Sequence, residues 1–201
     1  MNIYLEGVTN KMMFNVGDKI VYPMHGAGII EAIEEKSVCN EKQSYYIIKM
    51  PGEVKVMVPT AKAEDIGVRN IIDSETAGKV INILEQESTE MSVKWNKRYR
   101  DNVEKMKSGD IYEVADIVRN LSFKQKDKGL STTEKKMLLN AKQILVSELV
   151  LAESKDKEEI EELVESKINT SYELHSVVPT ADVNVAPETP ENVMKKFIPQ
   201  T

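Results

Sequence analysis

The hydrophobic pattern of this chain changes once, near residues 68–72, and that change restricts the possible folds more than any other feature. Before it, short runs rich in β-branched and aromatic residues are separated by proline and glycine, which is typical of short strands. From Asp73 onward, apolar residues recur every three or four positions, the spacing of amphipathic helices. A block of strands followed by a block of helices predicts an α+β protein with two domains.

The first block contains four or five candidate strands. The clearest lie near residues 19–22, 29–33, 45–50 and 54–58. Glycines in the Gly26-Ala27-Gly28 run allow the backbone to bend, and Pro51-Gly52 is a strong turn signal. So many short strands in so few residues predict a small curled sheet or barrel.

The second block contains about five candidate helices. They begin near Asp73, near Ser92, after Asp110, after Ser131 and near residue 156, and the last is acidic and ends near residue 166. The fourth has the capping-box pattern, in which the Ser131 side chain accepts a backbone hydrogen bond and the Glu134 side chain reaches back to the backbone N–H of Ser131. This block is therefore predicted to be all-helical.

These patterns divide the chain into four predicted parts. Residues 1–12 form an N-terminal extension, residues 13–70 a β domain and residues 71–168 a helical domain. Beyond Asn169 four prolines interrupt a tail rich in threonine and valine, so residues 169–201 are predicted to be disordered.

The N-terminus and the cysteine content predict a cytoplasmic protein. Residues 1–7 contain neither a basic leader nor a long apolar run, so we expect no signal peptide, and no segment is apolar enough to predict a membrane span. Cys39 is the single cysteine, which excludes an intramolecular disulfide and suits a reducing compartment.

The sequence offers little that would support catalysis. His25 and His175 are the only histidines, and neither has cysteine, aspartate or a second histidine at metal-ligand spacing. We interpret His25 as a turn residue with a structural hydrogen bond and Cys39 as an ordinary exposed thiol. No phosphate-binding loop or nucleophile elbow is present. We therefore predict that the protein is not an enzyme and needs neither cofactor nor metal.

The charge distribution indicates a different activity. The net charge is −6, but residues 94–142 carry 13 Lys and Arg against 7 Asp and Glu, a net charge of +6. This basic block begins with Lys94-Trp95-Asn96-Lys97-Arg98-Tyr99-Arg100, which holds the single tryptophan. A large aromatic ring among cations is typical of surfaces that meet nucleic acid, where cations bind phosphates and the ring presses against bases.

Two interpretations of the tryptophan segment remain open at this stage. Trp95, Tyr99 and Val103 share one helical stripe, so the ring could pack into the core. However, cations at a helix N-terminus are disfavoured by about 0.3–1 kcal/mol unless they face an anion, and phosphate is the usual one. A second basic cluster surrounds Gly129 and is either a solvated loop or part of the same basic face; it comprises Lys124, Lys126, Lys128, Lys135 and Lys136.

Several blocks, in order and spacing, resemble the CarD family of bacterial transcription regulators, also called CdnL-like, over about residues 13–165. The β part carries Phe14-Asn15-Val16-Gly17-Asp18, Val21-Tyr22-Pro23-Met24-His25-Gly26-Ala27-Gly28, Val58-Pro59 and Gly67-Val68-Arg69. The helical part carries Trp95-Asn96-Lys97-Arg98-Tyr99, Ser108-Gly109-Asp110, Gly129-Leu130-Ser131, Glu134-Lys135-Lys136-Met137 and the run from Ala141 to Leu149. The β part alone also resembles a domain of transcription-repair coupling factors.

The resemblance implies a Tudor-like (SH3-like) β domain that binds the RNA polymerase β subunit and a helical domain that contacts promoter DNA. In the family a tryptophan wedges into the minor groove at the upstream edge of the transcription bubble and stabilises the open complex, with little sequence specificity. The matching DNA-facing positions are Trp95, Lys97, Arg98, Arg100, Lys124 and Lys135.

The matching polymerase-facing positions are Lys36, Val38 and Met57. Met57 departs from the family pattern, because well-known relatives have a contacting arginine there. On this basis we expect a monomeric regulator of transcription initiation. The alternative is a protein-interaction adaptor on polymerase, with Trp95 buried and no DNA contact.

Overall fold

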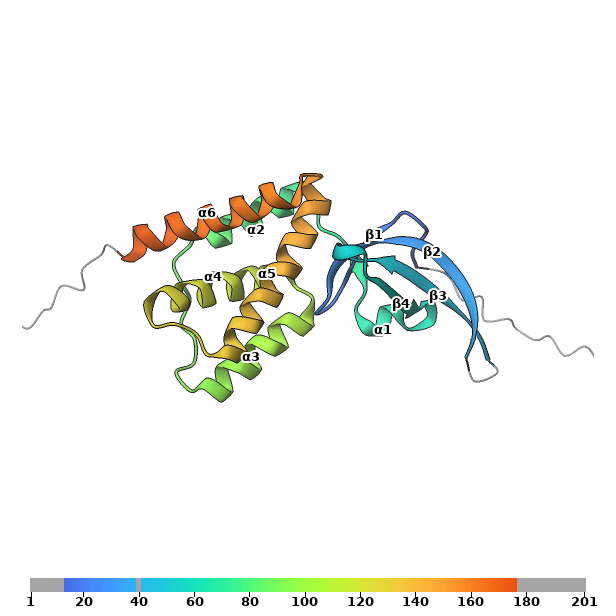
Figure 1. Cartoon of the computed structure of the whole chain (residues 1–201), viewed down its shortest axis with the longest axis horizontal. Helices are drawn as coiled ribbons and strands as arrows, with labels where there is room; N and C mark the ends of the chain where they lie inside the picture. Colours follow the sequence, from blue (N-terminus) through green and yellow to red (C-terminus); the bar gives the residue numbers. More distant parts are fainter. Residues whose placement is uncertain (1–12, 39–40, 177–201) are drawn as a thin grey trace, which may run out of the picture.

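A computed structural model describes residues 13–38 and 41–176 of the chain. The predicted extension at residues 1–12, the interpretation of Cys39 and the tail from residue 177 onward lie outside the described residues. The described part consists of an N-terminal antiparallel sheet followed by a group of helices (Figure 1). This confirms the predicted α+β class.

Among the described residues, the β domain is one five-stranded antiparallel sheet with the strand order β4-β3-β2-β1-β5. Its strands are β1 (Lys19–Tyr22), β2 (Gly26–Val38), β3 (Glu41–Lys49), β4 (Lys55–Pro59) and β5 (Arg69–Asn70), and a short helix, α1 (Ala63–Ile66), lies between the last two. The register of β2 against β3 shifts between Ile30 and Ala32, and such irregularities increase the local twist. The long β2–β3 pair is visibly curved (Figure 1).

One face of this sheet encloses a small apolar core. The buried side chains come from every part of the domain and include Phe14, Ile20, Ile30, Tyr46, Ile48, Met50, Val58, Ala63 and Val68. The Tyr46 hydroxyl accepts hydrogen bonds from the backbone N–H groups of Met13 and Phe14, both at 3.1 Å. These bonds pin the start of the described chain to the core.

Within the part of the chain that the structure describes, the helical domain contains five helices, as the sequence predicted. They are α2 (Ser74–Leu84), α3 (Trp95–Ser108), α4 (Ile111–Asp127), α5 (Thr132–Glu153) and α6 (Lys157–Ser176). Side chains of Asp73, Asp110 and Ser131 cap α2, α4 and α5 respectively. The predicted capping box is confirmed, because Ser131 and Glu134 satisfy each other's backbone N–H groups.

Helix α6 continues to Ser176, well beyond the predicted helix end at residue 166 and the predicted domain end at residue 168. Ile168 is fully buried, and the Ser171 hydroxyl lies within hydrogen-bonding distance of the carbonyls of Glu85 (2.9 Å) and Gln86 (3.0 Å). The Tyr172 ring meets Phe123 edge to face, with centroids 5.3 Å apart. Residues 169–176 are therefore helical, and the prediction that they belong to a disordered tail is wrong.

Helix α5 joins the two domains. The Ser147 hydroxyl accepts a hydrogen bond from the Ala27 N–H at 2.9 Å, and the fully buried Glu148 carboxylate accepts two from Arg69 at 2.6 and 2.9 Å. Gly26 has a positive φ of 96°, and a Cβ there would lie only 2.5 Å from the Ser147 hydroxyl oxygen. The close approach of β2 to α5 therefore requires glycine at position 26.

Candidate nucleic-acid interface

Trp95 is the first residue of α3, and its ring is partly exposed. The residue is 43% exposed. One face of the indole stacks on Tyr99, with centroids 5.7 Å apart and planes 18° apart, and its Nε1–H donates to the Ser131 hydroxyl at 3.3 Å. The ring is thus neither a core residue nor free in solvent. It is held against the protein on one side and open on the other.

Side chains of α4 hold the segment that leads into Trp95 in place. The Thr89 N–H donates to the Asn120 side chain at 2.9 Å, and the Arg119 guanidinium, only 1% exposed, donates to the Ile83 carbonyl at 2.9 Å and pairs with Asp116. Buried groups on α4 therefore hold the connection between α2 and α3.

The start of α3, the end of α4 and the start of α5 converge on the carboxylate of Glu134. Arg98 from α3 donates to Glu134 Oε1 through Nε at 2.9 Å and Nη2 at 2.6 Å. Lys124 from α4 lies 3.2 Å from both carboxylate oxygens, and the Ser131 N–H donates to Oε2 at 3.1 Å. The two basic clusters, whose proximity was open from sequence, are therefore side by side at one end of the helical domain (Figure 1).

Glu134 stays ionised in this setting. Burial by itself would raise the pKa of the Glu134 carboxyl, which is 3% exposed. Hydrogen bonds from Arg98, from the backbone and hydroxyl of Ser131 and from Lys124 outweigh burial and hold that pKa at about 2. The carboxylate consequently balances part of the positive charge of the interface.

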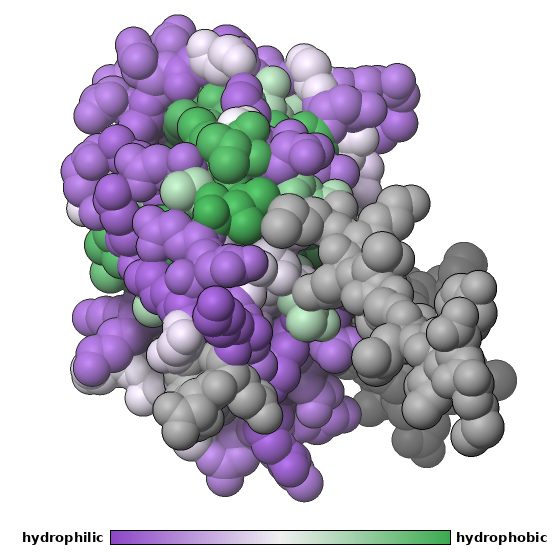
Figure 2. Space-filling view, turned by 90° about the vertical axis from the view of Figure 1, so that its right-hand side faces the viewer, coloured by the Kyte–Doolittle hydropathy of each residue, from purple (hydrophilic) through white to green (hydrophobic). Residues whose placement is uncertain are grey.

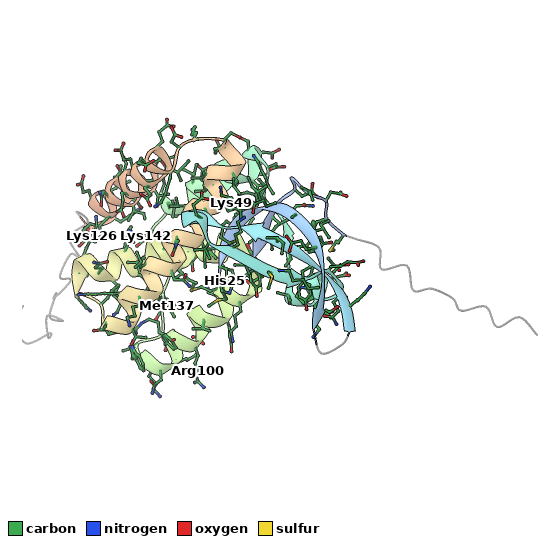
Figure 3. All side chains as sticks on the ribbon, turned by 45° about the vertical axis from the view of Figure 1, so that its right-hand side comes forward. His25, Lys49, Arg100, Lys126, Met137 and Lys142 are labelled. Carbon is green, nitrogen blue, oxygen red and sulfur yellow. The ribbon has the colours of Figure 1, made fainter. Side chains whose placement is uncertain are left out.

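The predicted DNA-facing cations differ in their exposure. Lys97, Arg100 and Lys135 are exposed, and Arg100 points away from the helical domain (Figure 3). Lys124 is half-buried and bound to Glu134.

Arg98 does not face solvent, so its assignment as a DNA-facing residue is corrected. It is 8% exposed, and its guanidinium bonds Glu134 and the carbonyls of Ser92 at 2.7 Å and Val93 at 3.2 Å. The anion that offsets this cation near the N-terminus of α3 is a carboxylate of the protein and not phosphate. The pairing joins residues 36 positions apart, which no local pattern indicates.

Two residues of this surface were missed. Val93 is 93% exposed immediately before Lys94 and Trp95, so it adds an exposed apolar side chain to this surface. Ser131 was recognised as a helix cap but not as the hydrogen-bond partner of the indole. An apolar residue inside a polar connection was the available signal for Val93, whereas no sequence signal connects Ser131 with Trp95.

Two of the three predicted polymerase-facing residues lie together on the β domain. The Lys36 Nζ is 3.2 Å from the Met57 sulfur and 3.2 Å from a Glu34 carboxylate oxygen. Met57 is 51% exposed, whereas Val38 pairs with Glu41 at the end of the hairpin and its side chain lies outside the described residues. Figure 2 views the molecule from the β-domain side and shows apolar residues grouped within a hydrophilic surface.

The register places further apolar side chains on the same outer face as Met57. Met57 pairs with Ile47, which pairs with Ala32 on the next strand. The neighbouring residues Tyr46, Ile48 and Val58 point into the core, and side chains alternate along a strand, so Met57, Ile47 and Ala32 lie on the opposite face of the sheet. Ile47 is only 7% exposed, so the exposed apolar surface beside Lys36 is Met57 itself.

Family models match both domains. Residues 14–72 match the CarD-like/TRCF RID domain, and residues 79–165 match the CarD C-terminal domain. A similar protein is YdeB of Bacillus subtilis (strain 168), a candidate transcription factor by its name, which is 46% identical over 138 residues, 68% of this chain and 90% of YdeB. The chain belongs to the CarD family. It is therefore a CarD-like protein of the transcription factor class, as the sequence resemblance predicted.

Metal-binding clusters and membrane-spanning helices are absent from the described part of this CarD family protein. It contains no group of three or more His, Cys, Asp or Glu side chains arranged to hold a metal ion, and none of its helices is long and apolar enough to cross a membrane. The backbone N–H of His25 donates to the Tyr22 carbonyl at 3.0 Å, and its ring stacks on Tyr22 with centroids 4.5 Å apart. This agrees with the interpretation of His25 as a turn residue.

Proposed function

We propose that this CarD family protein binds the RNA polymerase β subunit through its β domain and stabilises the promoter open complex through Trp95 and nearby cations. Trp95 acts as a wedge at the upstream edge of the transcription bubble. The observation that carries the proposal is the half-exposed indole at the start of α3, supported by Tyr99 and surrounded by exposed cations.

The wedge lowers the free energy of a distortion that polymerase has already made. Unstacking a base step costs a few kcal/mol, and an apolar ring inserted from the minor groove recovers part of that cost. The minor groove offers a degenerate pattern of donors and acceptors, so binding has little sequence specificity. The fixed backbone before Trp95 supports this role, since the inserted ring must keep its position when it contacts the bases.

Exposed cations supply most of the DNA affinity. Lys97, Arg100 and Lys135 bind phosphates, and α3 begins without a side-chain cap at Lys94, which suits a phosphate near its first N–H groups. Lys124 contributes less, because Glu134 already offsets its charge. Such binding is weak in isolation and falls as salt rises.

The β domain determines where the protein binds. Lys36, Val38 and Met57 contact the polymerase, and the CarD-like/TRCF RID match of this domain supports an interaction with RNA polymerase in general. Once bound, the domain holds the helical domain beside the promoter at a high effective concentration, so weak DNA binding is sufficient. We further propose a monomeric, cytoplasmic, non-enzymatic regulator that uses neither cofactor nor metal.

The test is the lifetime of open complexes formed with the cognate polymerase on a heparin-challenged promoter. We expect Trp95→Ala to shorten the lifetime about tenfold, equivalent to about 1.4 kcal/mol. Leu174→Ala is the matched control, since Leu174 is an exposed apolar residue (67%) on α6. A lifetime unchanged by Trp95→Ala, with polymerase binding intact, contradicts the wedge and favours an adaptor that does not touch DNA.

A further inference from the structure

The hydroxyl of Ser131 connects Trp95 to the buried ion cluster. It accepts from the indole Nε1–H at 3.3 Å and from the Glu134 N–H at 3.3 Å, and it donates to Glu134 Oε2 at 2.9 Å. A hydroxyl has one proton and two acceptor sites, so this hydroxyl is fully used. Its orientation is therefore set by Glu134 and not by solvent.

Glu134 also fixes the backbone from which Trp95 emerges. Arg98, held by Glu134 Oε1, donates to the carbonyls of Ser92 and Val93 just before the start of α3. The polar edge of the indole and the chain that carries the indole are thus attached to the same carboxylate. The Arg98–Glu134 pair at the centre of this network is buried and holds one geometry, because any rearrangement leaves a charge unpaired.

We propose that Ser131 is a positioning residue for Trp95, and that Glu134 holds Ser131 so that the indole is presented to DNA with its N–H already paired. This inference rests on the proposed wedge function. It assigns the serine at the N-cap of α5 a second role besides capping, which is to prepare the ring for insertion.

Two physical effects make the hydrogen bond between Ser131 and Trp95 useful. The indole has a single hydrogen-bond donor, and burying it unpaired between bases would penalise insertion. Pairing it with Ser131 removes that penalty, so the part of the ring that enters the groove is apolar. The tie and the Tyr99 stack also restrict the ring before it binds, which reduces the entropy lost on insertion.

The experiment compares Ser131→Gly with Ser131→Thr. Glycine is accepted at a helix N-cap at little cost, so Ser131→Gly removes the hydroxyl while largely keeping α5, and threonine retains the hydroxyl. Asp73→Gly is the matched control, because Asp73 caps α2 in the same way without contacting Trp95. Circular dichroism and thermal unfolding verify that all three variants fold.

The first readout is the mobility of the Trp95 ring. Trp95 is the single tryptophan, so its time-resolved fluorescence anisotropy in the full-length protein reports its motion directly. We expect Ser131→Gly to add a fast component that the wild type, Ser131→Thr and Asp73→Gly lack. If Ser131→Gly and the wild type have identical anisotropy decays, the Ser131 hydrogen bond does not restrict the ring and the proposal is overturned.

The second readout is the open-complex lifetime. We expect Ser131→Gly to shorten it about threefold to tenfold, the effect of losing one hydrogen bond, while Ser131→Thr and Asp73→Gly leave it unchanged. In a Trp95→Phe background, which lacks the indole N–H, Ser131→Gly should have no further effect. An equal shortening in that background overturns the proposal, because Ser131 would then act through the helix and not through the ring.

The remaining outcomes separate this inference from the proposed function. If Trp95→Ala shortens the lifetime but Ser131→Gly does not, the positioning role is overturned and the wedge stands. If Ser131→Gly lengthens the lifetime, the tie restrains the ring in an unproductive position, which also overturns the proposal. If Trp95→Ala itself has no effect, the wedge function fails and the role of Ser131 fails with it.

Discussion

Glu134 is a buried carboxylate that stays charged because three helices bring donors to it. Arg98, Lys124 and Ser131 come from the start of α3, the end of α4 and the N-cap of α5. A buried charge without partners would cost several kcal/mol, so removing Arg98, the buried partner of Glu134, should cost more than any surface substitution nearby. The residue thus determines the geometry of the candidate interface.

The low pKa of Glu134 predicts a pH dependence of stability. Its pKa is about 2 in the folded protein and about 4.5 in the unfolded chain, so the folded state favours the ionised form. This contribution, about 3 kcal/mol, is present above pH 4.5 and is lost as pH falls toward 2. Urea unfolding of the wild type and Glu134→Gln should show a stability gap that is widest near pH 7 and narrows below pH 4.5. A gap independent of pH would contradict this assignment.

For individual residues, contacts between sequence neighbours could be predicted, whereas contacts between residues far apart in the sequence could not. The Ser131–Glu134 box could be predicted because its partners are three residues apart, whereas the Arg98–Glu134 pair is created by tertiary packing. For the same reason Arg98 looked like a phosphate ligand. The partial exposure of Trp95 could not be predicted, because a stripe shared with Tyr99 suits both a core and a surface ring.

Among the elements, α3, α4 and α5 together make the candidate interface, and none of them makes it alone. The periodic helices and the punctuated strands were predictable, because long apolar stripes and Pro-Gly turns are strong local signals. The last part of α6 was not. Its contacts use Ser171 and Tyr172, polar residues that resemble a loop until their partners on α4 and after α2 are known.

The salt dependence of DNA binding tests the division of cations among these helices. Alanine at Lys97, Arg100 or Lys135 should each reduce the slope of log affinity against log salt by about 1, since each removes one phosphate contact. Alanine at Lys124 should reduce it less, because Glu134 already pairs this lysine. Lys79→Ala is the control, since Lys79 is exposed on α2 and pairs with Glu75. Equal slopes for all variants would contradict the proposed interface.

At the scale of the whole molecule, the proposed polymerase-binding and DNA-contacting surfaces lie on different domains that α5 holds together. Arg69 spans the junction by bonding both Glu148 on α5 and the Gly109 carbonyl before α4. Under the proposed function, the β domain therefore orients the wedge and does not merely carry it on a flexible linker. The same arrangement would let an acidic protein present one basic end to a promoter.

Substitutions in the β domain should separate the two activities. We expect Lys36→Ala and Met57→Ala each to weaken binding to the polymerase β subunit about fivefold, a typical effect for an interface anchor. Affinity for free DNA should stay unchanged, because the basic end belongs to the helical domain. Trp95→Ala should show the reverse, with normal polymerase binding. A pull-down titration unaffected by either β-domain change would contradict the polymerase assignment of this surface.

The central claim is that the Trp95 ring reaches the DNA at the upstream edge of the bubble. The most direct measurement uses 2-aminopurine, a base whose emission depends on stacking, placed at that edge in an open complex with the cognate polymerase. The wild-type protein should change the emission relative to polymerase alone, and Trp95→Ala should abolish that change while still binding polymerase. The same emission change with wild type and Trp95→Ala would contradict the account.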